Sequence, residues 1–472
     1  MLRGMSGSEA RRRARLHGTT VGRVRDDVLA YTAGDDLRLD VELVEYDCLG
    51  TAAHVTMLAA ARTRPPLLGR REARRVVREL GQMAVEARRG RFALRPEDQD
   101  CHLAIERILT ERLGDTGRRI HLGRSRNDQV ATALRLHTRD HLLGAVQEAA
   151  ALAEALLDFA GRHLRVPMAG RTHLQPAMPS SVGLWAAAWA EDLADDAVLM
   201  LNVADLADQC PLGSAASYGV PLPIDRALTA RLLGFSRPTH TVLYANHTRG
   251  KVEAAALHAC AQTMVTLSRM AEDLILFSMP EFGYFVLPAG FCTGSSIMPQ
   301  KRNPDVLELV RSRAARVAAD AAVTLEILRA APSGYNRDLQ DTKEPYLRGI
   351  GTTRATLRIL EPFVRGLNVR PERLAAGFLP EVFAADRAIE LASSGLPFRD
   401  AYQKVRGELD HLTREDPAAA IARKRHLGAP AGLDLALLRG RAAAAARMAG
   451  ESRARHRRAF TRLLGRPWPP GH

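Results

Sequence analysis

The chain has 472 residues, 46% of them hydrophobic and 25% charged, so it can fold around more than one packed core and is not a disordered protein. Its formal net charge of +14 comes from basic residues spread along the whole chain among acidic ones. No RNA-binding aromatic motif, zinc finger or basic zipper accompanies them, so we expect no nucleic-acid partner. A basic protein can still attract an anionic small substrate.

The composition and periodicity predict an all-α protein. Aromatic residues make up only 5% of the chain, and Ala, Leu and Arg, which favour helices, abound. Alternating runs of β-branched residues are missing from the long segments. In chain order, we expect short helices around 73–87 and 102–113, and then long helices over 129–164, 181–208, 252–278 and 305–331. After residue 369 we expect shorter helices.

The length predicts two or three domains, and the helix patterns divide the chain into the regions 1–122, 123–368 and 369–472, which we take as candidate domains. Helices of the length expected in the middle domain run about 40 Å at 1.5 Å per residue. Their broad apolar faces must be covered, either within a bundle or across subunits.

We expect a cytoplasmic protein without a membrane partner. The longest uncharged apolar stretch in a helical region, 254–268, is shorter than the roughly 18 residues of a membrane span. The N-terminal segment is rich in Arg and has no apolar core, unlike a secretory signal. The five cysteines are scattered and form no CxxC pair, which is typical of reduced thiols.

Three segments between the long helices carry small, polar and cationic residues, and we expect them to be irregular loops. They read HLGRSRNDQ (121–129), GRTHLQPAMP (170–179) and FCTGSSIMPQKRNPD (291–305). Each precedes a helix, and a helix N-terminus favours carboxylates. In the third segment Asn303 is a predicted N-cap with Pro304 after it. Together the segments favour binding of a dicarboxylate.

Taken singly, these residues have ordinary explanations. A serine in a loop is most often a solvated turn or cap, His173 alone would be a structural histidine, and Lys301 alone a surface charge. The glycines and flanking prolines of 288–299 nevertheless suit a loop that closes over a substrate. The sequence has no HExxH, CxxC, DxDxDG, GxGxxG or P-loop pattern, so we expect no metal and no nucleotide cofactor.

The combined motifs resemble those of a known family. GSSIMPQKRNP (294–304) is similar to the fumarase/aspartase superfamily signature GSSxMPxKxN. Three further segments resemble the argininosuccinate lyase branch of that superfamily, namely HLGRSRNDQVATALRL (121–136), RTHLQPAMP (171–179) and GYNRDLQDTKE (334–344). The resemblance extends over nearly the whole chain.

The resemblance implies a fold and an assembly. The fold would have three helical domains, the central one a long five-helix bundle. Four chains would form a homotetramer with a twenty-helix core, and each active site would be shared by three subunits.

The resemblance also implies an activity, the cleavage of argininosuccinate to arginine and fumarate through a carbanion, without a cofactor or metal. Ser295 would be the general base, and Lys301 would stabilise the charge that develops on the substrate carboxylate. His173, paired with Glu308, would help to deliver a proton to the leaving nitrogen. The motifs assign substrate contacts to Ser125, Arg126, Asn127, Thr172, Asn303, Tyr335, Gln340 and Lys343.

Three segments depart from the family pattern and leave alternatives open. LHGTT (16–20) stands where the family has WGGRF, and YTAGDD (31–36) stands where it has FNAS or FNDS with a substrate-contacting serine. NHTRGK (246–251) replaces SDRDF. One alternative is a paralogous lyase that releases fumarate from another N-succinyl adduct. Another is a non-catalytic, crystallin-like structural protein, although Ser295, Lys301, Asn303 and His173 are all present and favour an enzyme. Adenylosuccinate lyase is a weaker rival.

Overall fold

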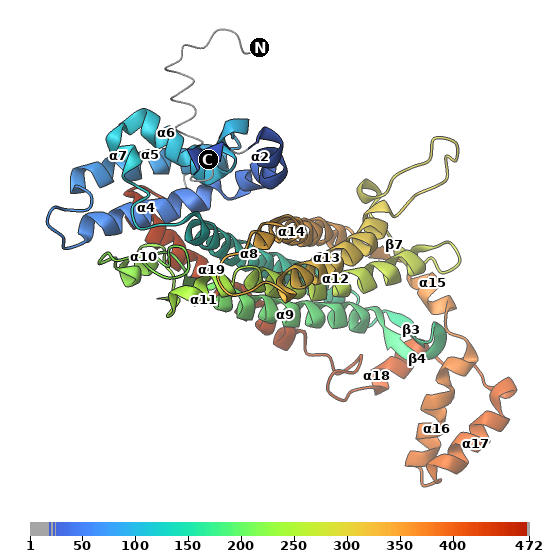
Figure 1. Cartoon of the computed structure of the whole chain (residues 1–472). Coiled ribbons are helices and arrows are strands. Elements are labelled where there is room, and N and C mark those ends of the chain that lie inside the picture. Colours follow the sequence, from blue (N-terminus) through green and yellow to red (C-terminus); the bar gives the residue numbers. More distant parts are fainter. Residues whose placement is uncertain (1–17, 20–21, 24, 470–472) are drawn as a thin grey trace. The chain divides into compact units, whose positions relative to one another are not determined.

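The computed structural model describes residues 18–19, 22–23 and 25–469, and helices make up most of them (Figure 1). The predicted all-α class is therefore confirmed. Residues 16, 17 and 20 of the LHGTT segment lie outside the described residues. None of the helices in the described part of the chain is both long and apolar enough to cross a membrane.

The described residues group into two compact units. The N-terminal unit comprises the residues up to Leu134, the segment Cys210–Asn246 and the residues from Arg458 onward. The bundle unit comprises Arg135–Gln209 and His247–Arg457. The boundaries of the three domains expected from the sequence stay a prediction.

In the N-terminal unit, α4 (Val44–Ala60) is buried on nearly every side, and α5 (Arg70–Arg88) packs against it. Helix α5 buries Ala73, Val76 and Leu80 and directs its arginines outward, as its amphipathic spacing requires. Helices α5 and α6 confirm the predictions around 73–87 and 102–113. The other elements that begin in this unit are β1 (Gly18–Thr19), β2 (Gly22–Arg23), α2 (Asp26–Ala33), α3 (Asp36–Leu39), α6 (Cys101–Leu113), α7 (Asp115–Arg118), α10 (Arg226–Leu232), β6 (Arg237–Pro238) and α11 (Val242–His247).

Long helices form the bundle unit and lie side by side in Figure 1. The four long helices expected from the sequence are confirmed to within about three residues at each end. They are α8 (Arg126–Arg162), which begins in the N-terminal unit, α9 (Val182–Ala207), α12 (Lys251–Ser278) and α13 (Asp305–Arg329). The remaining elements are β3 (Pro167–Thr172), β4 (Gln175–Ser181), β5 (Gln209–Cys210), β7 (Phe285–Val286), α14 (Lys343–Arg365), β8 (Asn368–Val369), α15 (Pro371–Ala376), α16 (Ala384–Ser393), α17 (Phe398–Gly407), α18 (Pro417–Arg423) and α19 (Leu435–Leu464).

Two long helices differ from the sequence-based expectation. Helix α14 is absent from the long helices expected from the sequence, and Pro345, Gly349 and Gly351 near its start are poor helix formers. Burial of one face, including Tyr346, Ile350 and Leu357, outweighs their poor helix propensity. The expectation of only short helices after residue 369 is wrong, since α19 has 30 residues.

Neighbouring long helices of the bundle unit run in opposite directions. Trp185 Nε1, near the start of α9, donates a hydrogen bond of 2.8 Å to Asp273 near the end of α12. Arg348 in the first turns of α14 pairs with Asp320 in the last turns of α13 at 2.5 Å. The bundle therefore has a hairpin end, where α9 and α13 begin, and a far end, where α12 and α14 begin.

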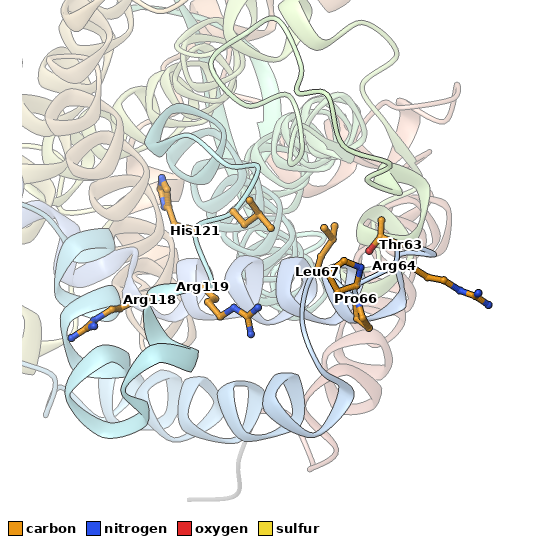
Figure 2. A pocket seen from close by; sticks show the side chains of 9 residues that line it. Thr63, Arg64, Pro66, Leu67, Arg118, Arg119 and His121 are labelled. Carbon is orange, nitrogen blue, oxygen red and sulfur yellow. The ribbon is translucent and has the colours of Figure 1, made fainter.

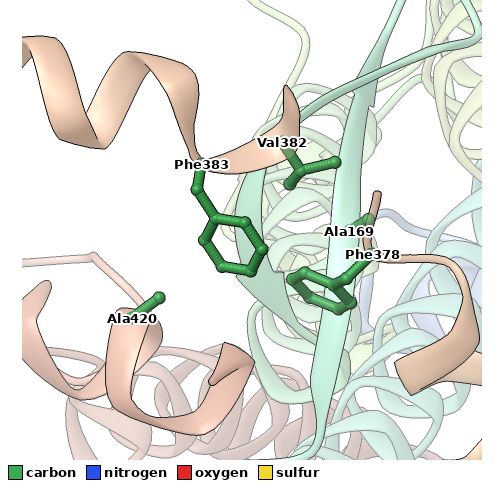
Figure 3. Packing of buried hydrophobic residues seen from close by; sticks show 5 residues of the cluster. All are labelled: Ala169, Phe378, Val382, Phe383 and Ala420. Atoms are coloured by element: carbon green, nitrogen blue, oxygen red, sulfur yellow. The ribbon is translucent and has the colours of Figure 1, made fainter. Parts of the chain in front are cut away.

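The segment 170–179, which we expected to be irregular, is part of a β-hairpin at the hairpin end. Strands β3 and β4 pair with each other. One face of this hairpin is covered by a buried cluster that includes Ala169 of β3 itself. The cluster consists of Ala169, Phe378, Val382, Phe383 and Ala420 (Figure 3). The rings of Phe378 and Phe383 stack with their centroids 5.9 Å apart. The Nζ atom of Lys424 donates a hydrogen bond of 3.0 Å to the carbonyl of Pro179.

The packing of this cluster predicts that one substitution in it strongly lowers the stability of the protein. Phe378→Ala removes a ring that is 2% exposed and should lower the free energy of unfolding by about 3–5 kcal/mol, because the cavity cannot fully collapse. Urea unfolding measures the loss. The matched control is Phe398→Ala, whose ring is 54% exposed and whose loss should stay below about 0.5 kcal/mol. Equal losses in both variants would contradict the packing described here.

Candidate active site

His173 lies in a tight, strained turn. The turn between the paired residues Thr172 and Gln175 consists of His173 and Leu174 alone, with φ values of 53° and 61°. When both residues of a two-residue hairpin loop have positive φ, they are usually Asn and Gly. The backbone of His173 and Leu174 is therefore strained. Arg171 stabilises the turn by donating a 2.8 Å hydrogen bond to the carbonyl of Leu174. The turn leaves Thr172 and His173 exposed.

The signature segment forms a loop that is closed at its base. Thr293 and Asn303 form an antiparallel bridge through two backbone hydrogen bonds of 3.2 and 2.8 Å. The Asn303 side-chain amide donates to the carbonyl of Gly294 at 3.4 Å, and the Thr293 hydroxyl bonds to Asp305. The predicted N-cap role of Asn303 is wrong, because α13 begins at Asp305 and Pro304 occupies the cap position.

Inside this loop, Ser295 is held by backbone donors. Its Oγ accepts hydrogen bonds from the N–H groups of Ile297 at 3.3 Å and Met298 at 3.2 Å. The N–H of Lys301 in turn donates to the carbonyl of Met298 at 3.1 Å, which fixes the lysine backbone in the same loop. The Lys301 side chain is exposed and has no partner among the residues that the structure describes.

Glu308 is exposed in the first turn of α13, at the same end of the bundle as the hairpin that carries His173. Within one chain the structure shows no hydrogen bond or ion pair between these two described side chains. The pairing expected from the sequence stays a prediction.

The remaining candidates of the bundle unit lie at its far end. Tyr335 follows α13 with its ring 5.1 Å from the guanidinium carbon of Arg249, Gln340 ends a short 3-10 helix, and Lys343 is the buried first residue of α14. Helix α13 has 25 residues and is therefore about 37 Å long. One chain alone does not bring Ser295 and Lys343 together.

The candidates Ser125, Arg126 and Asn127 lie at the start of α8, in the N-terminal unit. The Ser125 Oγ accepts the N–H of Asn127 at 3.3 Å, and the Asp128 carboxylate accepts the N–H of Ser125 at 3.0 Å. This is a capping-box arrangement. The Nε of Arg126 lies 3.0 Å from a carboxylate oxygen of Asp100, which is itself the N-cap of α6.

Asp128, which the sequence analysis did not select, organises this region. Its second oxygen accepts the N–H groups of Gly213 at 3.0 Å and Ala215 at 2.9 Å. Both of these loop residues have positive φ, so the carboxylate holds a strained loop against the start of α8. Burial raises the pKa of Asp128 to about 6, although the three N–H groups and Arg124 favour the charged form. The Ser-x-x-Asp spacing is the sequence signal that could have found it.

Three buried side chains of the N-terminal unit have the chemistry of metal ligands. Ligand atoms of Asp40, Cys101 and His102 lie within 4.8 Å of one another. Burial lowers the pKa of the His102 imidazole, but Asp47, Asp100 and Asp40 together raise it above its ordinary value. His102 Nδ1 lies 3.0 Å from Asp47, so this ring nitrogen already faces a carboxylate.

A groove of about 730 Å³ also lies in the N-terminal unit, between the loop after α4 and the segment after α7 (Figure 2). Much of its positive charge is neutralised, since Arg118 pairs with Asp115 at 3.1 Å and Arg119 lies 3.7 Å from Glu72. None of the candidate site residues lines it. The lining residues are Thr63, Arg64, Pro65, Pro66, Leu67, Arg118, Arg119, His121 and Leu122.

Comparison with known proteins identifies the family. The model of a lyase family matches residues 22–319. The chain is 47% identical over 408 residues to an argininosuccinate lyase of Sorangium cellulosum (strain So ce56), covering 86% of this chain and 94% of that protein. The chain belongs to the argininosuccinate lyase family. An argininosuccinate lyase of Xylella fastidiosa (strain Temecula1 / ATCC 700964) is 44% identical over 415 residues, covering 88% of this chain and 92% of that protein.

Solved structures agree on the fold of this lyase. A variant of EDDS lyase with bound fumarate superposes with a TM-score of 0.77 at 22% identity, covering 94% of this chain and 97% of that one. A class II fumarase from Schistosoma mansoni superposes with a TM-score of 0.65 at 17% identity, covering 87% and 90%. At such identities the likeness shows a common fold, and the predicted membership of the fumarase/aspartase superfamily is confirmed by the family matches above.

The buried Asp128 predicts a pH effect on the stability of this lyase. Its pKa is about 6 in the folded chain against an ordinary 3.8. Between about pH 4 and 6 the folded chain therefore keeps a proton that the unfolded chain releases, and this carboxyl contributes about 3 kcal/mol less stability as the pH rises through that window. Asp128→Asn removes the titration and should flatten this part of the profile, measured by urea unfolding at successive pH values.

The matched control is Asp115→Asn, whose side chain is 90% exposed and which should keep the wild-type slope. If Asp128→Asn also keeps that slope, Asp128 is not the group that titrates.

Proposed function

We propose that this lyase cleaves argininosuccinate to arginine and fumarate. The observation that carries the proposal is the environment of Ser295, whose Oγ accepts two backbone N–H groups in a loop that also carries Lys301. Abstraction of a proton beside a carboxylate is difficult, because the carbanion adds negative charge next to an existing one. Preorganised donors and cations at that position lower the barrier.

In this proposal Ser295 is the general base. Donation from the N–H groups of Ile297 and Met298 stabilises an alkoxide more than a neutral hydroxyl, and this favours the deprotonated serine that must attack the proton. Lys301 and Asn303 would hold the carboxylate on which the charge develops. Loss of such a contact commonly lowers the rate by about 10²–10³.

His173 and Glu308 would deliver a proton to the leaving nitrogen, directly or through water. The strained turn supports this role for His173, since backbone strain of this kind is usually retained where it positions a functional group. Thr172, on the same turn, would contact the substrate. Because the two side chains do not pair within one chain, their contact would form between copies.

The arginine end of the substrate would bind at the far end of the bundle, to Tyr335, Gln340 and Lys343. Ser125, Arg126 and Asn127 would complete the substrate contacts from the start of α8. Since about 37 Å of helix separates Ser295 from Lys343 within a chain, both can reach one substrate only if they come from different copies. We therefore propose a homotetramer in which three subunits share each site.

The surface of α13 supports this assembly. Its outward face carries small and apolar side chains, with Val323 50% and Leu325 44% exposed and Ala315, Ala318 and Ala322 between the charged ends. A row of alanines allows another helix to approach closely, and water would otherwise cover this apolar surface. A second copy of the same bundle is the occupant that completes the proposed site.

We also place the enzyme in the cytoplasm. All five cysteines are free thiols, and four of them are buried, which suits a reducing compartment.

Ser295→Ala should abolish turnover, because it removes the hydroxyl that takes the proton. The measurement is the ultraviolet absorbance of fumarate after addition of argininosuccinate. The matched control is Ser296→Ala, the adjacent exposed serine, which should keep most of the activity. Full activity of Ser295→Ala would refute the assigned base. If the wild type releases fumarate only from another N-succinyl adduct, the paralogous lyase is the correct alternative.

A mixing experiment tests the shared site. Ser295→Ala and Lys343→Met chains should each be inactive alone, and co-expressed chains should regain a fraction of the wild-type activity. The physical reason is that mixed assemblies contain some sites with an intact Ser295 from one copy and an intact Lys343 from another. Absence of any recovery, with mixed assemblies verified by two affinity tags, would show that both residues of a site come from one chain.

A further inference from the structure

Arg249 is a buried cation whose Nε has no hydrogen-bond partner among the described residues. Its side chain is 5% exposed and lies two residues before α12, at the far end of the bundle. Its Nε is enclosed without a hydrogen-bond partner, and none of the described residues accepts a hydrogen bond from its guanidinium. A buried guanidinium left in this state costs free energy, so a native structure usually supplies an anion for it.

Glu253 does not serve as the missing acceptor for Arg249. The two charges interact, but among the described residues no hydrogen bond joins them, and Glu253 Oε2 already accepts the N–H of Gly250 at 2.7 Å. Arg135 also acts on this carboxyl, and it donates to Thr248 Oγ1 at 2.7 Å and to the carbonyl of Leu206 at 3.0 Å. The guanidinium of Arg249 therefore remains available to donate hydrogen bonds to a bound anion.

The backbone and an aromatic ring hold Arg249 in place. Gly250 has a φ of 80°, and a Cβ at this position would lie 2.5 Å from Leu328, so the chain direction after Arg249 is fixed. The guanidinium carbon lies over the Tyr335 ring, 5.1 Å from its centre, which is a cation–π contact that uses no N–H donor. A fixed guanidinium edge matches the two oxygens of a carboxylate.

We propose that Arg249 binds the α-carboxylate of the arginine half of the substrate. This inference rests on the proposed function, which places that half beside Tyr335, Gln340 and Lys343. Argininosuccinate carries three carboxylates, and the two on the succinate half lie next to the reacting carbon and belong with Ser295 and Lys301. The α-carboxylate of the arginine half is far from the bond that breaks, and Arg249 faces the segment assigned to that half.

The test compares two ligands that differ by this carboxylate. Arginine and agmatine, its decarboxylated form, are titrated into the full-length enzyme and their dissociation constants are measured by calorimetry. Wild-type enzyme should bind arginine about 10- to 100-fold more tightly than agmatine, as expected for a charge-assisted pair. Arg249→Met should bring this ratio close to one, while the inhibition constant of fumarate stays unchanged. Arg249→Lys should restore part of the preference.

The matched control is Arg269→Met, another arginine of the bundle unit that stacks on an aromatic ring, 5.6 Å from the centre of Trp189. It should keep the wild-type ratio. An unchanged preference for arginine in Arg249→Met would overturn the proposal, and so would a loss of fumarate binding as large as the loss of arginine binding, because that indicates general damage to the site.

A second measurement separates this proposal from the proposed activity. Removal of an unpaired buried charge should raise the melting temperature of Arg249→Met above that of the wild type in a buffer without carboxylates. Added acetate, at constant ionic strength, should stabilise the wild type and not the variant. If the wild type releases no fumarate from argininosuccinate, the proposed function fails while this difference still supports an anion site at Arg249. Equal stabilisation of both proteins by acetate overturns the site even in an active enzyme.

Discussion

The length of the bundle helices is the constraint on which the rest of the structure depends. Helix α13 holds the loop of Ser295 at one end and leads to Tyr335 and Lys343 at the other, and its 25 residues cannot be shortened without losing the packing against α12 and α14. A substrate of ordinary size cannot span about 37 Å. The chemistry proposed for this chain is therefore inseparable from association with further copies.

The segments that carry the proposed site residues depend on buried groups to which we assign no chemical role. The turn of His173 extends from a hairpin that is covered by the Phe378 cluster. The loop of Ser295 is closed by the bridge between Thr293 and Asn303. In the N-terminal unit, the Asp128 carboxylate fixes the start of α8. Strained or exposed functional groups are thus supported by packing and hydrogen bonds just behind them, which is the usual way of maintaining a precise site.

Arginine serves two purposes in this basic chain. Several arginines of the bundle unit have acidic partners, as when Arg354 bonds to Glu148 at 2.7 Å and Arg439 bonds to Glu154. These pairs join helices that are far apart in sequence, and at exposed positions each contributes little to stability. Arg249 differs because it is buried and no carboxylate in the described part of the chain bonds to it, and for this reason we assign it to a ligand.

The sequence by itself determined the all-α class, the positions of most long helices and the family, because helix periodicity and a long signature such as GSSIMPQKRNP are local properties of the chain. Local signals failed where packing decides. Helix α14 forms despite Pro345 and Gly349 because one face is buried, and the segment 170–179 becomes a hairpin because a cluster from residues 378–420 covers it. Only the tertiary structure could reveal the raised pKa of Asp128 and the unsatisfied donor of Arg249, since burial and unsatisfied donors arise when distant segments meet.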